Sequence, residues 1–251
     1  MSNIKNIKHK LQVFILYLFL LLSFVGFSGS SIAYAEGVDS QFQAGDWLLR
    51  MRATLLVPED GADNVDVAGI ASFQNEVVDV KNSFLPELDI TYFLNENFAV
   101  EVICCAAYLR AHASGDLAAA IPGLGLSGTE VAETWALPAT IMFQYHFNLT
   151  STIKPYVGVG PTYVLFLGEK VGSALKPIAT DLKLEDSWGF TLQAGVDANI
   201  GGNWFLNLDA KYMHVEVDAK WNTPGVGNGS IEATNLRLNP WVLSVGLGYR
   251  F

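Results

Sequence analysis

Hydrophobic and polar residues alternate along the last part of this chain. Trp241, Leu243, Val245, Leu247, Tyr249 and Phe251 share one face, while Val242, Ser244, Gly246, Gly248 and Arg250 share the other. Alternation with a period of two is the signature of a β-strand with one apolar face. The last strand therefore runs to the aromatic residue that ends the sequence.

The same alternation recurs in seven earlier segments, so the pattern predicts eight strands. They cover residues 46–57, 84–94, 97–110, 134–147, 153–167, 187–200, 203–218 and 236–251. Beyond residue 27 no apolar run approaches the length of a membrane helix, although 51% of all residues are hydrophobic. Such a composition favours membrane strands over membrane helices, and eight is the smallest common size of a membrane barrel.

The connections between these segments alternate in length. Those at 95–96, 148–152 and 201–202 are short, whereas 58–83, 111–133, 168–186 and 219–235 are long. Tight turns on one side and long loops on the other are typical of outer-membrane barrels. We therefore predict an all-β fold, an eight-stranded antiparallel transmembrane β-barrel with short periplasmic turns and four long extracellular loops. In that class the last strand, here ending at Phe251, is the signal for the barrel-insertion machinery.

Aromatic residues cluster at the short-turn ends of the predicted strands and predict a periplasmic girdle at the headgroup level. They are Trp47, Tyr92, Phe98, Tyr145, Phe147, Tyr156, Trp204, Tyr249 and Phe251. Prolines oppose a regular closed barrel, because a proline has no N–H for the strand ladder. Pro86, Pro138, Pro155, Pro161 and Pro240 lie in or near strands, so some of them should mark bulges or strand ends.

The N-terminus predicts export. Lys5, Lys8 and Lys10 precede an apolar run that ends near residue 27, and an Ala-Tyr-Ala sequence ends at Ala35. We interpret residues 1–35 as a cleaved secretory signal peptide and residues 36–251 as the barrel, in the outer membrane of a Gram-negative bacterium. A retained transmembrane helix is the alternative, but the run is barely long enough to span.

Charge and cysteine usage narrow the set of partners. Removing three lysines with the signal leaves 12 of the 15 basic residues against 25 acidic ones, which argues against nucleic acid. Acidic residues gather within 58–81, either as a solvated loop or as a cation-bridged contact to lipopolysaccharide. Cys104 and Cys105 are adjacent in a strand, point to opposite faces and should not bridge each other.

Charged side chains lie on the face opposite the apolar one. A charged side chain that faced lipid would cost several kcal/mol of free energy, so these side chains must point into the barrel. An eight-stranded barrel is just wide enough for its side chains to fill it. We therefore predict a lumen plug of ion-paired residues in the periplasmic half, centred on Arg50, Arg52, Glu87, Asp89 and Glu101. Inward residues higher up are less charged, and Gly158 and Gly160 leave room for a narrow cavity.

The second long loop is unexpectedly apolar. Residues 116–128 read DLAAAIPGLGLSG, and exposed apolar surface usually marks an interaction site. We predict that this loop and the first strand line a ligand-channel mouth, with Leu56, Leu117, Ile121, Leu124 and Leu126 as its residues. A loop that folds over the rim or dips into the outer leaflet is an equal alternative.

Catalytic chemistry finds little support in the sequence. Beyond the signal the histidines are His112, His146 and His214, none in a recognisable nucleophile arrangement. His214 is followed by Val215 and Glu216, so the His-x-Ser pair of barrel lipid A deacylases is missing. No phosphate loop, metal-spaced Cys/His cluster or dinucleotide fingerprint occurs. We predict no catalytic residue, cofactor or metal.

Seven strings in order resemble the OmpW family of small outer-membrane proteins. They are LPELDITYF at 85–93, NFAVEV at 97–102, LPATIMFQYHF at 137–147, PYVGVG at 155–160, DSWGFTLQAGVD at 186–197, NWFLNLDAKY at 203–212 and NPWVLSVGLGYRF at 239–251. The resemblance implies an eight-stranded barrel with a narrow apolar cavity that is open to the outside. It also implies passive uptake of small hydrophobic solutes across the lipopolysaccharide layer, with exit sideways through the barrel wall into the membrane.

Two other functions fit the same sequence features. The first is a barrel that does not transport and serves in adhesion or envelope stress resistance through its loops. The second is a lipid-modifying barrel enzyme.

Overall fold

The computed structural model describes residues 41–59, 61–67, 69, 71–75, 78–114 and 128–251. The predicted signal peptide lies outside these residues and stays a prediction. Within the described part, no helix has the length and apolar character needed to cross a membrane.

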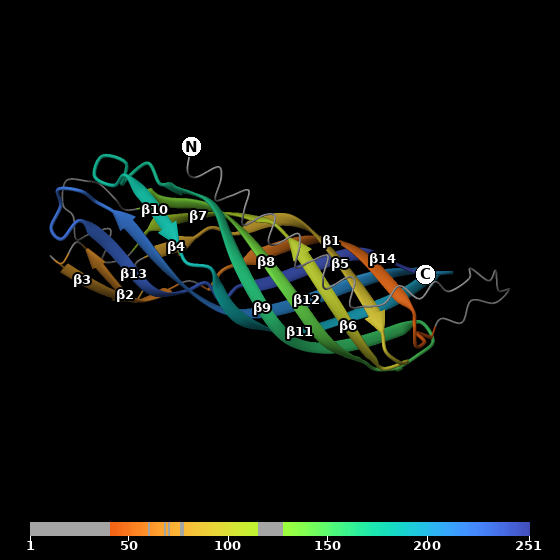
Figure 1. Ribbon diagram of the computed structural model, residues 1–251. Helices are drawn as coiled ribbons and strands as arrows, with labels where there is room; N and C mark the ends of the chain where they lie inside the picture. The colour runs from red at the N-terminus through yellow and green to blue at the C-terminus, as the bar shows by residue number, and fades with distance from the viewer. Residues whose placement is uncertain (1–40, 60, 68, 70, 76–77, 115–127) are drawn as a thin grey trace. The chain divides into compact units, whose positions relative to one another are not determined.

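Eight antiparallel strands close into a barrel (Figure 1). Their order in space is β11, β9, β8, β6, β5, β1, β14 and β12, and β12 pairs back with β11. The strand β6 continues as β7 after a break at Ala106. The bounds are β1 Trp47–Val57, β5 Ser83–Phe93, β6 Phe98–Cys105, β7 Ala107–Ala113, β8 Glu130–His146, β9 Ile153–Val171, β11 Ser187–Gly201, β12 Trp204–Asn222 and β14 Trp241–Arg250. This closure confirms the predicted fold class.

The three short connections are turns, as predicted. In the turn after β5, the side chain of Asn95 accepts hydrogen bonds from the backbone N–H groups of Asn97 and Phe98, at 2.9 and 2.8 Å. The turn between β11 and β12 uses Gly201 and Gly202 at φ values of 127° and 56°. These left-handed conformations suit glycine, because it has no Cβ to clash with the backbone.

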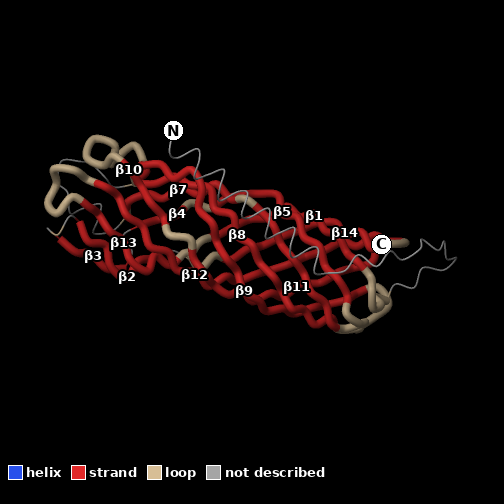
Figure 2. The backbone as a smooth tube through the Cα atoms, viewed as in Figure 1, coloured by secondary structure: helices blue, strands red, loops and turns tan. Residues whose placement is uncertain are grey.

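The long connections carry additional strands that the sequence pattern does not predict. These are β2 Gly61–Val67, β3 Ala71–Asn75, β4 Val78–Val80, β10 Asp181–Leu184 and β13 Ser230–Arg237. β13 pairs with both β12 and β2, and β10 pairs with β12. Figures 1 and 2 show β2, β3, β10 and β13 gathered at the end of the barrel away from the C-terminus.

The predicted start of the last strand is wrong, because residues 236–251 contribute to two strands. β13 ends at Arg237 and β14 begins at Trp241. Asn239 between them has a φ of 25°, and Pro240 has no N–H to continue a ladder. The side-chain oxygen of Asn239 instead accepts a hydrogen bond of 3.1 Å from the backbone N–H of Val215.

A second interruption lies where Pro161 faces β8. The β8–β9 ladder pairs Thr140 with Thr162 and then Phe143 with Val159, with no pairs between them. At the neighbouring Gly160, a Cβ would lie 1.8 Å from the carbonyl oxygen of Ile141. Proline and glycine together therefore mark a local irregularity in the wall without a change of register.

The outer face of the barrel is apolar and bears aromatic pairs at two levels. Near the short turns, Trp47 packs against Tyr92, Phe98 against Tyr145, and Trp204 against Tyr249. Towards the other end, Tyr108 packs against Trp135, Tyr163 against Trp188, and Tyr212 against Trp241. Exposed Leu, Val and Phe side chains cover the wall between the two levels. Two aromatic girdles that border an apolar band are typical of a barrel in a bilayer.

Tyr156 was assigned wrongly to the periplasmic girdle. It is 1% exposed and lies inside the barrel, where its ring stacks on His146. The error is one of strand parity, because Tyr156 and Lys154 share the inward face of β9 while Val157 faces outward.

The two cysteines are free, as expected for neighbours that point to opposite faces of a strand. Cys105 packs against the apolar cluster inside the barrel. Both free thiols act as small apolar side chains in the packing of the wall.

Candidate functional site

Alternation places the predicted plug residues on the inner face of three neighbouring strands. Arg50 and Arg52 come from β1, Glu87 and Asp89 from β5, and Glu101 from β6. The β1–β5 register sets Arg50 directly opposite Asp89 and Arg52 directly opposite Glu87. All five residues are at most 1% exposed. The sheet register therefore places opposite charges side by side.

The two arginines share two carboxylates. Nη1 of Arg50 lies 3.0 Å from Oδ1 of Asp89 and 3.1 Å from Oε1 of Glu101. Nη1 of Arg52 lies 2.8 Å from Oδ2 of Asp89, and its Nη2 lies 3.1 Å from Oε1 of Glu101. Arg52 also pairs with Glu87 at 2.8 Å. The structure thus brings all five predicted residues into one buried ionic network.

Further strands complete this network from the opposite wall. Arg50 donates from Nε and Nη2 to both oxygens of Asp197 on β11, at 3.1 and 2.7 Å. Lys211 on β12 pairs with Glu87 at 2.8 Å and with Asp209 at 2.6 Å. The hydroxyl of Tyr156 donates to Asp209 at 2.7 Å. Ion pairs therefore cross the barrel from β1 to β11 and from β5 to β12.

Neutral amides fill the remaining space. Gln193 donates to Glu101 at 2.8 Å and to Asp209 at 2.9 Å, and Gln144 donates to Glu101 at 2.8 Å. A Cβ at Gly158 would lie 2.8 Å from the side-chain oxygen of Gln193. The expectation that Gly158 leaves room for a cavity is therefore wrong, because these amides occupy its space.

An aromatic cluster lies at the short-turn end of the interior. Phe42, which precedes β1, is fully buried and stacks on Phe93 at 4.1 Å and on Phe205 at 5.1 Å between ring centroids. Nζ of Lys154 lies 5.3 Å from the centre of the Phe42 ring and donates to Gln41 at 2.7 Å. The segment before β1 therefore packs inside the barrel, on the short-turn side of the ionic network. The sequence pattern misses Phe42 because this residue belongs to no alternating segment.

Two small apolar cavities lie on the other side of the ionic network. The lower one, of about 40 Å³, is lined by residues including Leu56, Leu109, Pro138, Val164 and Met213. The upper one, of about 60 Å³, shares Val80, Leu109 and Leu238 with it and extends to Phe166, Leu184 and Trp221. Leu56 therefore lines the lower cavity. The other four residues predicted for the mouth, Leu117, Ile121, Leu124 and Leu126, lie outside the described residues.

Trp221 lies at the far side of the upper cavity. Its indole is 5% exposed and donates a hydrogen bond of 3.1 Å to the carbonyl oxygen of Val131 on β8. Trp221 lies in the connection 219–235, which the alternation pattern predicts as a loop, so no pattern in the sequence indicates its role.

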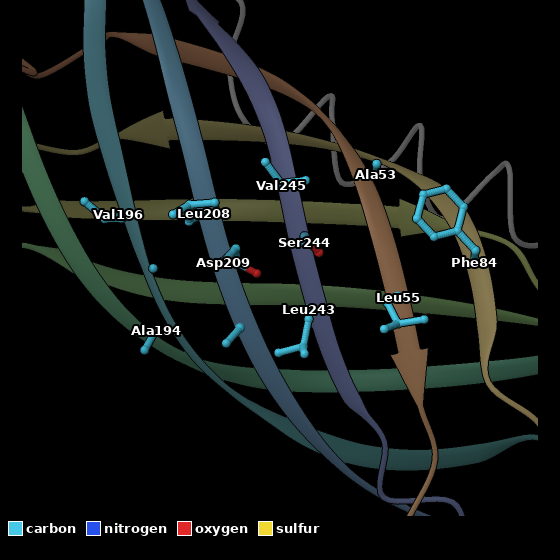
Figure 3. A pocket seen from close by; sticks show the side chains of 12 residues that line it. Ala53, Leu55, Phe84, Ala194, Val196, Leu208, Asp209, Leu243, Ser244 and Val245 are labelled. Carbon is cyan, nitrogen blue, oxygen red and sulfur yellow. The ribbon is translucent and has the colours of Figure 1, made fainter.

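A separate hollow on the barrel wall faces the membrane. Figure 3 shows Leu55, Leu243, Leu208, Val245 and Phe84 around it, on β1, β14, β12 and β5. Small residues such as Ala53 and Ala194 leave the space between these side chains. The hollow shares no lining residue with the two cavities inside the barrel. Most of its lining is apolar, and the buried Asp209 and Ser244 lie at its floor between the strands.

The remaining candidate chemistry is sparse in the described residues. His146 is fully buried between the rings of Phe93 and Tyr156, and His214 lies 4.0 Å from Glu216 on the surface. Among the described residues, no three His, Cys, Asp or Glu side chains come together as metal ligands. Two acidic residues of the first loop have local partners: Asp79 pairs with Lys81, and Asp66 accepts hydrogen bonds from the N–H of Gly69 and the hydroxyl of Ser72.

A closed eight-stranded barrel with an apolar outer band, two aromatic girdles and a charged interior defines an outer-membrane β-barrel of a Gram-negative bacterium. The family comparison agrees with this class. Residues 43–251 match the model of the OmpW family, and the chain belongs to that family.

Similar proteins cover most of the chain. It is 31% identical over 211 residues to outer membrane protein W of Vibrio cholerae, which covers 83% of this chain and 90% of that protein. It is 29% identical over 210 residues to outer membrane protein AlkL of Ectopseudomonas oleovorans, 84% of each chain. The crystal structure of OprG from Pseudomonas aeruginosa shares the fold, with a TM-score of 0.73 at 24% identity over 84% of this chain and 98% of that one. The predicted family and the outer-membrane location are thereby confirmed.

Proposed function

We propose that this protein passively admits small apolar molecules across the lipopolysaccharide layer. The observation that carries the proposal is the pair of apolar cavities on the extracellular side of the buried ionic network. The lining of both cavities is almost entirely aliphatic or aromatic. Lipopolysaccharide is a polar barrier to apolar solutes, and a dry passage through it needs complementarity but no energy source.

The ionic network acts in this proposal as a plug that stops water, ions and apolar solutes from passing straight through. Arg50, Arg52, Glu87, Asp89 and Glu101 fill the cross-section together with their partners on β11 and β12. The Phe42 cluster lies beyond it. A solute in the apolar cavities therefore leaves sideways through the wall into the outer membrane.

Admission requires the extracellular half to open. Ligand pockets for small molecules span about 300 to 1,000 Å³, whereas the two cavities hold about 60 and 40 Å³. We assign the structure to a closed state, in which Trp221 covers the upper cavity. The proposed mouth comprises Leu117, Ile121, Leu124 and Leu126 of the second loop, with Leu56 deeper in the passage.

The test is uptake of labelled n-octane by cells that lack other channels for apolar solutes, with and without this protein. A charged solute of similar size is measured beside it. Faster uptake of n-octane alone supports the proposal. If neither solute enters faster in cells that carry the folded barrel, transport of apolar solutes is overturned. Replacement of the four second-loop residues by serine then tests the mouth, because uptake should fall if they line it.

A surface-binding function is the second candidate, and the strands beyond the outer girdle favour it. β13 joins β12 to β2, and this sheet carries exposed ion pairs such as Lys220 with Glu232. A barrel that serves adhesion or stress resistance would lose its effect when this sheet is altered, with n-octane uptake unchanged. We propose no catalytic role, since the buried His146 and surface His214 lack a nucleophile partner among the described residues.

A further inference from the structure

Hydroxyl groups form a layer inside the barrel. Thr140 on β8, Thr162 on β9 and Thr191 on β11 are joined by hydrogen bonds of 2.9 Å and 2.6 Å between their Oγ1 atoms. On the opposite wall, Thr54 and Ser244 share a hydrogen bond of 2.8 Å. These five side chains are between 0 and 7% exposed. We call them the hydroxyl layer.

The layer separates the apolar cavity from the ionic network. On three strands, the inward-facing residue next to a threonine of the layer lines the lower cavity. These residues are Leu56 next to Thr54, Pro138 next to Thr140 and Val164 next to Thr162. One further inward position along β1 from Thr54 is Arg52, which belongs to the ionic network. A solute that reaches the inner end of the apolar passage therefore meets hydroxyls before it meets charges.

These hydroxyls have hydrogen-bonding capacity left over. Three hydroxyl groups on β8, β9 and β11 carry three donor hydrogens, but two hydrogen bonds join them. Thr54 and Ser244 likewise carry two donors for the one bond between them. Leaving a buried donor without an acceptor is costly. If the layer served packing alone, valine would fill the same space without that cost.

We propose that the hydroxyl layer binds the polar end of a neutral amphiphilic solute whose apolar tail lies in the cavities above. Its ligand class is a short linear molecule with one terminal hydroxyl, such as an alkanol. A carboxylate end fits poorly. Leu85 on β5 pairs with Thr54 of the hydroxyl layer, and the next inward residue on β5 is Glu87, whose Oε2 has no hydrogen-bond partner. This inference rests on the proposed function and names the solute class within it.

The experiment measures competition for uptake of labelled n-octane in cells that carry the full-length protein. Unlabelled 1-octanol and unlabelled n-octane are the two competitors. The triple variant Thr140→Val, Thr162→Val, Thr191→Val removes three hydroxyls at nearly constant volume. Thr162→Ser keeps the central hydroxyl, and Thr180→Val on the exposed surface is the matched control.

One to two lost hydrogen bonds should raise the half-inhibitory concentration of 1-octanol about two- to tenfold in the triple variant. That of n-octane should stay unchanged, and Thr162→Ser and Thr180→Val should behave as wild type. Equal inhibition by 1-octanol in wild type and triple variant would overturn the subsite. If the triple variant does not accumulate as a folded barrel, the single change Thr162→Val decides by the same comparison.

Failure of the proposed function looks different. In that case the wild-type protein does not speed n-octane uptake over cells without it, and both the passage and its subsite are overturned. The subsite alone is overturned if the wild-type protein speeds n-octane uptake but 1-octanol has the same half-inhibitory concentration in the wild type and in the triple variant.

Discussion

The indole of Trp221 on β12 reaches a backbone carbonyl on β8, although β11 and β9 separate these two strands in the barrel wall. The acceptor, Val131 O, also accepts a hydrogen bond of 2.9 Å from the N–H of Gly172 beyond β9. A side chain that links walls this far apart crosses the interior above the upper cavity. Trp221 is therefore placed to control the extracellular opening of the passage.

We expect Trp221→Ala to speed uptake of n-octane about two- to tenfold, because it removes both the hydrogen bond, about 1 kcal/mol, and the ring that covers the cavity. Trp221→Phe keeps a ring without the N–H and should lie between alanine and wild type. Initial uptake rates, divided by the amount of folded barrel, measure the effect. An alanine variant that transports no faster than wild type would remove Trp221 as the closing residue.

Replacing one arginine of the ionic network should destabilise the barrel strongly. Arg52→Met removes one cationic partner from Glu87, Asp89 and Glu101, so that only Lys211 and Arg50 remain to balance these buried carboxylates, at a cost of about 3 to 5 kcal/mol. Urea unfolding of the barrel in lipid vesicles measures the free energy of unfolding. Lys183→Met is the control, because its pair with Glu185 is largely exposed and should contribute less than about 1 kcal/mol. Equal effects of the two substitutions would contradict the structural importance of the network.

The sequence predicted the wall of this barrel well and its interior only in part. Strand parity sufficed to place Arg50, Arg52 and Glu101 inside, since a charge cannot face lipid and the period of two then fixes every neighbour. It failed for Tyr156, whose amphipathic ring suits either a girdle or a polar interior. Trp221 and Phe42 were missed because their positions depend on contacts with distant strands, which no local pattern encodes.

The outer girdle was missed for a related reason. Tyr163 and Trp188 face each other across β9 and β11 only in the register that the structure shows. The long connections were interpreted as loops because β2, β10 and β13 are short and polar. Their strand structure comes from pairing with the extended ends of the barrel strands, as β10 and β13 do with β12.

Phe42 should contribute to stability although it lies before the first strand. Phe42→Ala removes a fully buried ring from between Phe93 and Phe205, and such changes cost about 3 to 5 kcal/mol. The same urea unfolding measures it. Leu149→Ala in an exposed turn should change the free energy of unfolding by less than about 0.5 kcal/mol. A Phe42 effect as small as that of Leu149 would show that the segment before β1 is not part of the barrel core.

Protonation of Glu232 should weaken the extracellular sheet. Hydrogen bonds from Lys220 and Ser230 hold the pKa of this carboxyl below its ordinary value of 4.5. Because the folded pKa is the lower one, the stabilisation is fully present above pH 4.5 and is lost as the pH falls through the folded pKa. Lys220→Met should raise the pKa of Glu232 towards 4.5, whereas Lys183→Met should not. Carboxyl-carbon NMR titration of the folded protein measures both, and an unchanged Glu232 titration in Lys220→Met would refute the ion pair between Lys220 and Glu232.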